Sequence, residues 1–297
     1  MPNDYSKLPI TVLLATKNEA VNLPRCLDAL RMAERIVVLD SESTDATVEI
    51  ALAYDAEVVQ FKYKGGYPKK RQWGLENLTI ETPWFFLLDA DEVITEVLWD
   101  DIAAAIHGSE NYDAFFVRKG FHFLGRRMNF GGFSHMAVLL VRTGKGRFEQ
   151  LLSDSANSLD MEIHERLVVQ GRIGRLKTPL IHEDFKGLEA YIFRHNKYST
   201  WEAQVRYRYL TTGRYGEDTI QPGFFGNSQE RRRWIKTIVI RIPFEHHLWF
   251  LYHYFFRLGF LEGQAGLIAS RIRSSYISQT RSKMYELRLQ SGSQGNV

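Results

Sequence analysis

Residues 84–92 read Trp-Phe-Phe-Leu-Leu-Asp-Ala-Asp-Glu, so five apolar residues run directly into three carboxylates. An apolar run of this length is typical of a strand buried on both faces of a parallel sheet. Asp89 and Asp91 are then expected just past the carboxyl end of the strand, where open α/β sheets bind ligands. A divalent cation that also contacts substrate phosphates would relieve the repulsion between them. The alternative is a charged turn that only ends the strand.

Strand and helix patterns alternate along the first third of the chain. Such alternation predicts an α/β fold with a mostly parallel sheet between layers of helices. From residue 188 onward the pattern becomes helical, which predicts a helical C-terminal extension. The expected strands are 10–15, 36–39, 57–61 and 84–88, and the expected helices are 24–33, 46–54, 69–77 and 95–106.

The totals exclude several classes of protein. The formal net charge of the 297 residues is only +3, which gives no general nucleic-acid signature. Cys26 is the single cysteine, so an internal disulfide is impossible and a reducing compartment is expected. The N-terminus lacks the apolar core of a signal peptide. No apolar, charge-free stretch reaches 18 residues, so no membrane-spanning helix is expected.

Two further strand ends carry candidate ligand-binding groups. Asp40 follows the second strand and can accept from a nucleobase N–H or from ribose hydroxyls, while Ser43 or Asp45 can cap the following helix. Arg71 opens a helix, and a guanidinium suits a diphosphate. For Lys69 and Lys70, a solvated helix start is an equal alternative.

Two candidate catalytic groups come later in the chain. Glu165 stands among apolar residues and can act as a general base. His182 can complete an oxygen-rich metal shell with Asp91, because imidazole is acceptable to Mn²⁺. A surface charge or a hydrogen-bonded core histidine is the alternative for either residue, and for the neighbouring His164.

The C-terminal third combines arginines with aromatic residues. Residues 229–234 are basic, residues 249–257 form an apolar aromatic run, and Arg271 and Arg273 follow. Such a combination is typical of segments that dock at a membrane interface, where basic groups meet lipid phosphates. The alternative is an amphipathic helical pair that packs on the preceding domain.

Four of these segments, in this order, resemble the motifs of the family 2 glycosyltransferases with the GT-A fold. The segment Ile163–Leu167 together with His182 is similar to a bacterial subgroup that extends lipopolysaccharide core or the lipid-linked glycans of capsule and exopolysaccharide. The four motif segments are 15–19, 40–47, 71–74 and 89–92.

The resemblance implies a catalytic domain over residues 1–187 and a helical region over 188–297. It implies an inverting enzyme that moves one sugar from a nucleotide-diphosphate sugar, with UDP expected first, to a lipid-linked or lipopolysaccharide acceptor. Glu165 would be the base. The donor would be held by Thr16, Asn18, Glu19, Asp40, Arg71, Asp89 and Ala90, and Mn²⁺ or Mg²⁺ by Asp89, Asp91 and His182. The expected location is the cytoplasm, peripheral on the inner face of the plasma membrane.

The sequence departs from the family pattern at two motif positions. Glu42 replaces a glycine and Gln72 replaces an asparagine. The Gln-x-x-Arg-Trp motif of processive members is also absent, since Gln229 and Arg233 are one residue too far apart. Two rival interpretations remain: a sugar nucleotidylyltransferase, which would want a glycine-rich loop after the first strand, and a catalytically inactive membrane-associated scaffold.

Overall fold

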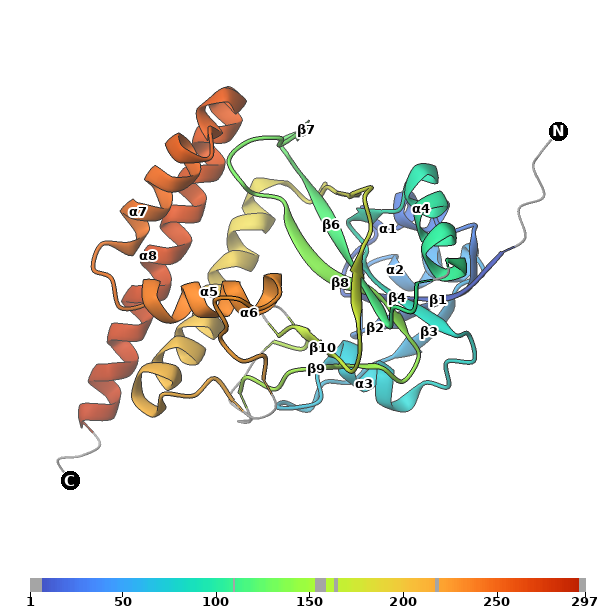
Figure 1. The fold of residues 1–297 in the computed structure, drawn as a ribbon, viewed down its shortest axis with the longest axis horizontal. Helices are drawn as coiled ribbons and strands as arrows, with labels where there is room; N and C mark the ends of the chain where they lie inside the picture. The colour runs from blue at the N-terminus through green and yellow to red at the C-terminus, as the bar shows by residue number, and fades with distance from the viewer. Residues whose placement is uncertain (1–6, 109, 153–158, 163–164, 217–218, 294–297) are drawn as a thin grey trace.

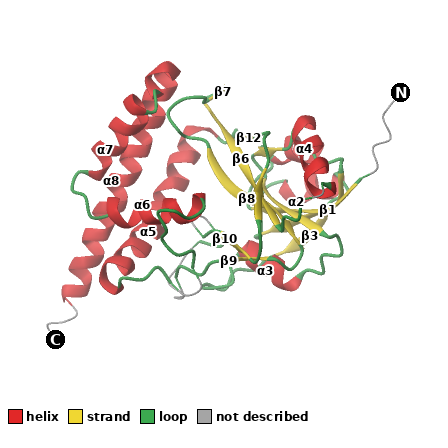
Figure 2. Ribbon diagram, in the orientation of Figure 1, coloured by secondary structure: helices red, strands yellow, loops and turns green. Residues whose placement is uncertain are grey.

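The computed structural model describes residues 7–108, 110–152, 159–162, 165–216 and 219–293. Within these ranges ten strands form one sheet, with helices packed around it and a separate group of helices at the C-terminal end (Figures 1 and 2). The strand order along the main path is β3-β2-β1-β4-β8-β6-β12-β5. The predicted α/β class, with a helical C-terminal extension, is confirmed.

The first half of the sheet is parallel, as the apolar runs predict. Its strands are β1 (Leu8–Thr16), β2 (Ala33–Asp40), β3 (Glu57–Gln60) and β4 (Trp84–Asp89). β1 lies between β2 and β4, so both of its backbone edges are hydrogen-bonded, and its side chains are buried at all positions except Pro9. This explains why β1 and β4 are almost continuously apolar.

The second half of the sheet is mixed, and the sheet as a whole is mostly parallel, as predicted. β8 (His135–Arg142) runs antiparallel to both β4 and β6 (Ala114–Phe123). The remaining strands are short: β5 (Glu92–Val93), β7 (Arg126–Arg127), β11 (Ile173–Arg175) and β12 (Leu180–His182) join the sheet, while β9 (Gly146–Phe148) and β10 (Leu167–Val169) pair separately.

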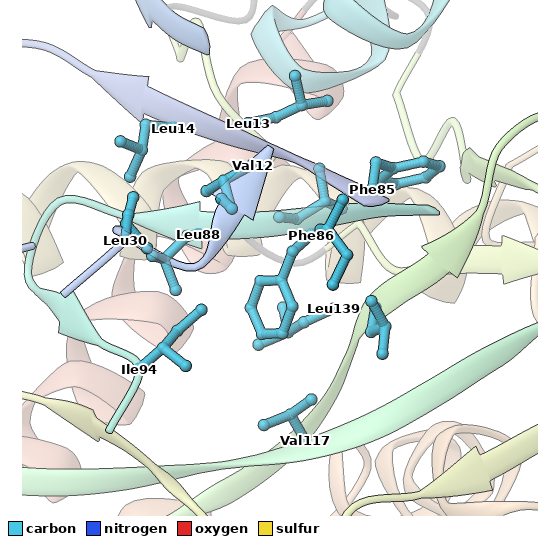
Figure 3. Packing of buried hydrophobic residues seen from close by; sticks show 14 of the residues in the cluster. Val12, Leu13, Leu14, Leu30, Phe85, Phe86, Leu88, Ile94, Val117 and Leu139 are labelled. Atoms are coloured by element: carbon cyan, nitrogen blue, oxygen red, sulfur yellow. The ribbon is translucent and has the colours of Figure 1, made fainter. Parts of the chain in front are cut away.

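Three helices connect the strands of the first half, and a fourth connects β5 to β6: these are α1 (Leu23–Asp28), α2 (Thr47–Ala53), α3 (Lys70–Asn77) and α4 (Glu96–His107). One large hydrophobic core joins them to the sheet. Figure 3 shows Phe85, Phe86 and Leu88 of β4 among residues of β1, β6 and β8. Burying large side chains of this kind stabilises the fold by about 1.5–3 kcal/mol each.

Helix α3 packs closely on β2 because it carries a glycine. A Cβ built at Gly74 would lie 2.5 Å from Cδ1 of Leu39, which is completely buried. A side chain at this position would therefore force α3 away from the sheet. The close packing of α3 on β2 thus explains the glycine at position 74 of the third motif segment.

The C-terminal region is helical and lies on the side of the molecule opposite the N-terminus (Figure 1). Buried ion pairs join its helices, since Arg206 contacts both Glu202 and Glu245. No helix of the described residues is long and apolar enough to cross a membrane. The helices are α5 (Gly187–Thr212), α6 (Ser228–Val239), α7 (Glu245–Leu251), the π-helical η1 (Tyr252–Phe256), the 3₁₀ turn η2 (Gly259–Glu262) and α8 (Gly263–Ser293).

Some expected boundaries are wrong. The helix expected over 24–33 ends at Asp28, because β2 already begins at Ala33. β6 extends to Phe123 and forms an antiparallel hairpin with β7, in which His122 pairs with Arg127. The expected strand-like segment 163–167 and His164 fall partly or wholly outside the described residues.

Candidate active site

The carboxylates at the ends of β2 and β4 lie at one edge of the sheet, on either side of the end of β1. The register pairs Thr16 with Asp40 across β1 and β2, and Ala15 with Asp89 across β1 and β4. All three strands are parallel, so their carboxyl ends meet at this edge. The prediction that Asp40, Asp89 and Asp91 share an edge is confirmed.

Asp40 is completely buried and organises the loop after β2. Its Oδ1 accepts a hydrogen bond of 3.1 Å from the Thr16 hydroxyl, and its Oδ2 accepts one of 2.9 Å from the Ser43 amide. Asp45 accepts from the Thr47 amide at 3.1 Å, but the N-cap of α2 is Ala46 and no side chain of the described residues caps this helix, so the expected cap by Ser43 or Asp45 is wrong. The carboxylate of Asp40 therefore fixes the loop against the end of β1.

Asn18 and Glu42 adopt positive φ angles of 54° and 53° at the two facing loops. The Asn18 side chain accepts a 2.8 Å hydrogen bond from the Thr44 amide, which ties the first motif to the second. Asparagine tolerates this left-handed conformation, whereas glutamate does so at a cost. Glu42 thus keeps the backbone shape that the family's glycine would adopt freely.

Glu19 connects the end of β1 to the segment after β12. It lies 2.5 Å from Lys186 Nζ and accepts a 2.9 Å hydrogen bond from the Asn22 amide group. Asn22 is the N-cap residue of α1, but its side chain does not cap the helix and instead contacts Asp184 and the backbone of Phe185. Burial raises the pKa of Glu19, against the opposing effect of Lys186.

Both carboxylate oxygens of Asp89 face cations. The Arg71 guanidinium contacts Oδ1, and Lys119 Nζ lies 3.0 Å from Oδ2 and 2.6 Å from the fully buried Glu92. Although burial acts to raise it, these two cations hold the pKa of Asp89 well below its ordinary value. The pairing with Arg71 agrees with a diphosphate site that gathers positive charge.

The start of α3 is held by a carboxylate from far along the chain. Glu162 accepts hydrogen bonds of 3.1 Å and 3.0 Å from the backbone amides of Arg71 and Gln72. A carboxylate at this position satisfies the free amides of the helix and interacts well with the helix dipole. The Gln72 side chain, which replaces the family's asparagine, accepts a 2.7 Å hydrogen bond from the Phe148 amide.

Lys69 and Lys70 are buried, so the solvated helix start is wrong for both. Lys69 is 4% exposed and Lys70 is 1% exposed. Lys70 donates a 2.6 Å hydrogen bond to the Thr16 carbonyl and lies 3.3 Å from Asp160. Burial lowers the pKa of Lys70. Asp160 and Glu162 cover this helix start, which is why the lysines are removed from solvent.

Asp91 and His182 lie side by side although they are far apart in sequence. His182 Nε2 is 3.4 Å from Asp91 Oδ2, because β12 brings the histidine next to β5 at Glu92. Burial acts to lower the pKa of His182, but Asp91 outweighs it and the pKa is raised. Ala90, which precedes Asp91, is buried at 3% exposure.

The donor set fits a metal that is shared with a substrate. Within the described ranges, no three His, Cys, Asp or Glu side chains form a cluster that would hold a metal on their own. Asp91 and His182 offer one oxygen and one nitrogen donor, while Asp89 is directed to Arg71 and Lys119. Mg²⁺ and Mn²⁺ at phosphate sites commonly take their other ligands from the phosphates and water.

Glu165 is buried and paired. Its carboxylate lies 2.6 Å from Lys69 Nζ, and the side chains are 5% and 4% exposed respectively. The Lys69 ammonium also lies 4.7 Å from the ring centre of Trp201 in α5. Lys69 and Arg71 are two residues apart, so the pair with Glu165 and the pair with Asp89 are both attached to the start of α3.

Lys119 is the residue that the sequence patterns missed. It interrupts the apolar part of β6 and is 8% exposed. A lysine inside an otherwise buried strand was the available signal, since such a charge needs a partner. Its partners, Asp89 and Glu92, come from a segment that only the folded sheet brings close.

Comparison with known proteins agrees with the motif order. Residues 11–135 match the family model described as glycosyl transferase family 2. The chain carries a family 2 glycosyltransferase domain. Of the interpretations left open by the sequence, the glycosyltransferase is therefore the one confirmed, in place of the nucleotidylyltransferase.

Several proteins are similar to this transferase over most of its length. A lipopolysaccharide core biosynthesis glycosyltransferase, LpsC, of Rhizobium meliloti is 27% identical over 286 residues, covering 94% of this chain and 93% of that protein. An uncharacterized glycosyltransferase of Rickettsia bellii is 25% identical, covering 95% and 87%. The crystal structure of S. aureus TarS 1–349 in complex with UDP has a TM-score of 0.42 and 19% identity, with 91% of each chain covered.

Proposed function

We propose that this transferase moves one sugar from a nucleotide-diphosphate sugar, with UDP as the nucleotide, to a hydroxyl of lipopolysaccharide core or of a lipid-linked glycan, with inversion at the anomeric carbon. The observation that carries the proposal is the pairing of Arg71 with Asp89 beside Asp91 and His182, at the carboxyl edge of a family 2 domain. The acceptor class is supported by the similarity to LpsC, whose name assigns it to lipopolysaccharide core biosynthesis.

In this proposal the nucleotide lies against the loops that follow β1 and β2. Thr16, Asn18 and Glu19 come from the first loop and Asp40 from the end of β2. The hydrogen bonds between these loops hold their backbone in one shape before a donor arrives. A preformed site of this kind loses little conformational entropy on binding.

The diphosphate would lie against Arg71, Asp91 and His182. Asp91 and His182 would hold Mn²⁺ or Mg²⁺, which when bound neutralises the charge that develops on the leaving diphosphate. Arg71 supplies a second, permanent positive charge. Lys119 keeps Asp89 ionised, and Asp89 in turn orients the Arg71 guanidinium.

Glu165 would accept the proton of the acceptor hydroxyl as that oxygen attacks the anomeric carbon. Lys69 fixes the position of its carboxylate through the 2.6 Å contact. Attack from the face opposite the leaving group gives inversion. Residues 1–187 would contain this machinery, and residues 188–297 would support it and present it to the acceptor.

A donor screen tests the proposed function directly. Purified protein with Mn²⁺ would be incubated with UDP-, GDP- and dTDP-sugars, and both hydrolysis and thermal shift would be measured. We expect saturable stabilisation and slow hydrolysis with a UDP-sugar. Absence of both with every donor would contradict the proposal and favour the inactive scaffold. The Asp91→Ala variant, which removes a proposed metal ligand, is tested in the same screen. Its control is Asp100→Ala, which removes an exposed aspartate of α4.

We also propose that the C-terminal region docks on the cytoplasmic face of an anionic membrane. Within residues 244–261, nine large apolar side chains are more than 40% exposed, and Phe256 reaches 80%. An apolar surface of this extent marks an interaction site. The exposed Arg257 and Arg271 lie in the same region and suit anionic headgroups. The nine are Phe244, Leu248, Leu251, Tyr252, Phe255, Phe256, Leu258, Phe260 and Leu261.

Vesicle flotation tests the membrane proposal. The protein should float with vesicles that contain phosphatidylglycerol and should not float with neutral vesicles at moderate salt. Phe255→Ser combined with Phe256→Ser should abolish flotation. Val97→Ser, at a 63% exposed position on α4, should leave it unchanged. Equal flotation of all variants would contradict the assignment of this surface.

A further inference from the structure

A pocket lies between α5, α6 and the segment that precedes β10, on the helical side of the molecule (Figure 1). Trp201 and Tyr215 form part of its wall. The proposed transfer mechanism uses none of its charged groups. We term it the basic pocket, after the four cationic side chains that line it: Arg166, Arg206, Arg233 and Lys236.

The guanidinium of Arg166 has no carboxylate partner in the described part of the chain. It donates a hydrogen bond to the main-chain carbonyl of Gln229. Burial, followed by repulsion from Arg233, lowers the pKa of Arg166 to about 10. Glu149 compensates this charge only in part, since it acts on Arg166 without an ion pair to the guanidinium, and an anion that enters the pocket would add to the compensation.

Arg233 and Lys236 carry donors that the protein does not fully use. Arg233 is 3% exposed and pairs with Glu149, yet its Nε has no hydrogen-bond partner among the described residues. Lys236 contacts Glu202 at 3.4 Å, and Arg206 already lies 2.8 Å from the same carboxylate. Desolvation and repulsion from Arg206 outweigh the attraction of Glu202 and lower the pKa of Lys236 to about 8, although 40% of its side chain is exposed.

The basic pocket adjoins the candidate base. Trp201, which lines the pocket, lies 4.7 Å from Lys69 Nζ, and Lys69 holds Glu165. Arg166 directly follows Glu165 in the chain. A group bound in the pocket would therefore lie near Lys69 and Glu165.

We propose that the basic pocket binds an oxyanion, a phosphate or carboxylate group, that the acceptor glycan carries. Arginine forks and a lysine ammonium recognise such oxygens through charge-assisted hydrogen bonds. The inference that the oxyanion belongs to an acceptor glycan rests on the proposed transfer function. The inference that the pocket binds an oxyanion does not. The pocket selects acceptors by charge and places the acceptor beside Glu165.

Inorganic phosphate is the first probe. Thermal unfolding would be followed at increasing phosphate, with chloride at equal ionic strength as reference and with UDP present to occupy the donor site. Wild-type protein should be stabilised saturably. Lys236→Gln should weaken half-saturation about tenfold, since a charge-assisted hydrogen bond is worth about 1.5–3 kcal/mol. Lys236→Arg should retain binding.

Arg231→Gln is the matched control, because it removes one positive charge from the same helix at an exposed position outside the pocket. It should respond to phosphate like the wild type. If Lys236→Gln and Arg231→Gln respond equally, or if phosphate stabilises no variant beyond chloride, the oxyanion site is wrong.

Transfer kinetics form the second arm, with lipopolysaccharide core oligosaccharide as acceptor before and after phosphatase treatment. Lys236→Gln should raise the KM for acceptor about tenfold with little change in kcat or in donor hydrolysis. If the KM difference between Lys236→Gln and the wild type disappears after dephosphorylation of the acceptor, the bound group is a phosphate. If the difference persists, the bound group is a carboxylate. An unchanged acceptor KM overturns the acceptor assignment. If wild-type protein processes no donor, the proposed function fails, but phosphate binding still decides the site.

Discussion

The carboxylate of Glu165 lies 2.6 Å from the ammonium of Lys69, and both side chains are at least 95% buried. We expect Glu165→Gln to reduce transfer by about 10²–10⁴-fold, since the proton acceptor is lost. Donor binding, measured as the thermal shift with UDP, should not change. Glu189→Gln, at an exposed position on α5, is the control. Full activity of Glu165→Gln would refute the assignment of the base.

The same pair predicts a loss of stability that can be separated from catalysis. Glu165→Gln leaves the buried Lys69 without its carboxylate, which should cost about 3–5 kcal/mol of unfolding free energy. The double variant Lys69→Met and Glu165→Gln should recover most of that stability without recovering transfer. Recovery of transfer together with stability would show that Glu165 has only a structural role.

Lys119→Met should destabilise the protein by about 3–5 kcal/mol, because the buried Glu92 and the partly buried Asp89 lose a shared cation. The loss of the Lys119 partner should cost more at Glu92, which is completely buried, than at Asp89. Urea unfolding measures the loss. Arg118→Met changes the preceding, exposed residue of the same strand and should alter stability by less than about 0.5 kcal/mol. Similar values for the two variants would contradict the pairing.

Removal of the metal should abolish transfer. We expect a chelator to stop turnover and Mn²⁺ to restore it, and we expect Asp91→Ala and His182→Ala to lose Mn²⁺ binding in the presence of UDP, measured by electron paramagnetic resonance. Asp100→Ala should bind Mn²⁺ like the wild type. Turnover that is unaffected by a chelator would show that Arg71 and Lys119 provide the positive charge without a metal.

Glu42→Gly should stabilise the protein by a few tenths to about 1 kcal/mol. Glycine removes the strain of the positive φ at this position, although it also gains freedom in the unfolded chain. Glu42→Ala keeps the strain and should give no gain. Thermal unfolding of the two variants makes the comparison. Equal stability of glycine and alanine at this position would show that the strain is negligible.

Acidification should weaken the C-terminal region through His253. Burial, which leaves Nε2 without a partner among the described residues, lowers the pKa of His253 to about 4, against the opposing effect of the hydrogen bond that Nδ1 donates to the Gly131 carbonyl. The unfolded chain takes up the proton near pH 6.5, before the folded chain does. Stability should therefore fall as the pH drops from about 6.5 to about 4, by at most about 3 kcal/mol.

His253→Gln should flatten this pH dependence, and His247→Gln, at an exposed position, should leave it as in the wild type. Unfolding by urea at several pH values between 4 and 7 provides the measurement. The same slope in His253→Gln and in the wild type would exclude His253 as the titrating group.

Apolar patterning predicted the part of the site that lies on neighbouring parallel strands. The apolar runs that end at Asp40 and Asp89 predict two buried strands. Because buried strands of this kind are parallel, the polar residues that follow them are expected at the same edge of the sheet. The contact of Asp91 with His182 was also expected, and the structure brings the two together.

Patterning could not predict which distant segment covers α3. Lys69 and Lys70 have the composition of a solvated helix start, yet Glu165 and Asp160 lie about ninety residues away and neutralise them. Lys119 was missed for a related reason, since β8 enters the sheet between β4 and β6. Long-range pairing of this kind leaves no local periodic signal.

Gly74 sets the position of α3 on the sheet, and the start of α3 carries groups of both the donor side and the acceptor side of the site. The close seat of α3 on Leu39 fixes the height of one helical turn above the sheet. That turn is preceded by Lys69, which touches the proton acceptor, and contains Arg71, which faces the departing nucleotide. A methyl group at residue 74 would displace Lys69 and Arg71 together. A shift at this one backbone position would therefore impair the donor side and the acceptor side of the site at the same time.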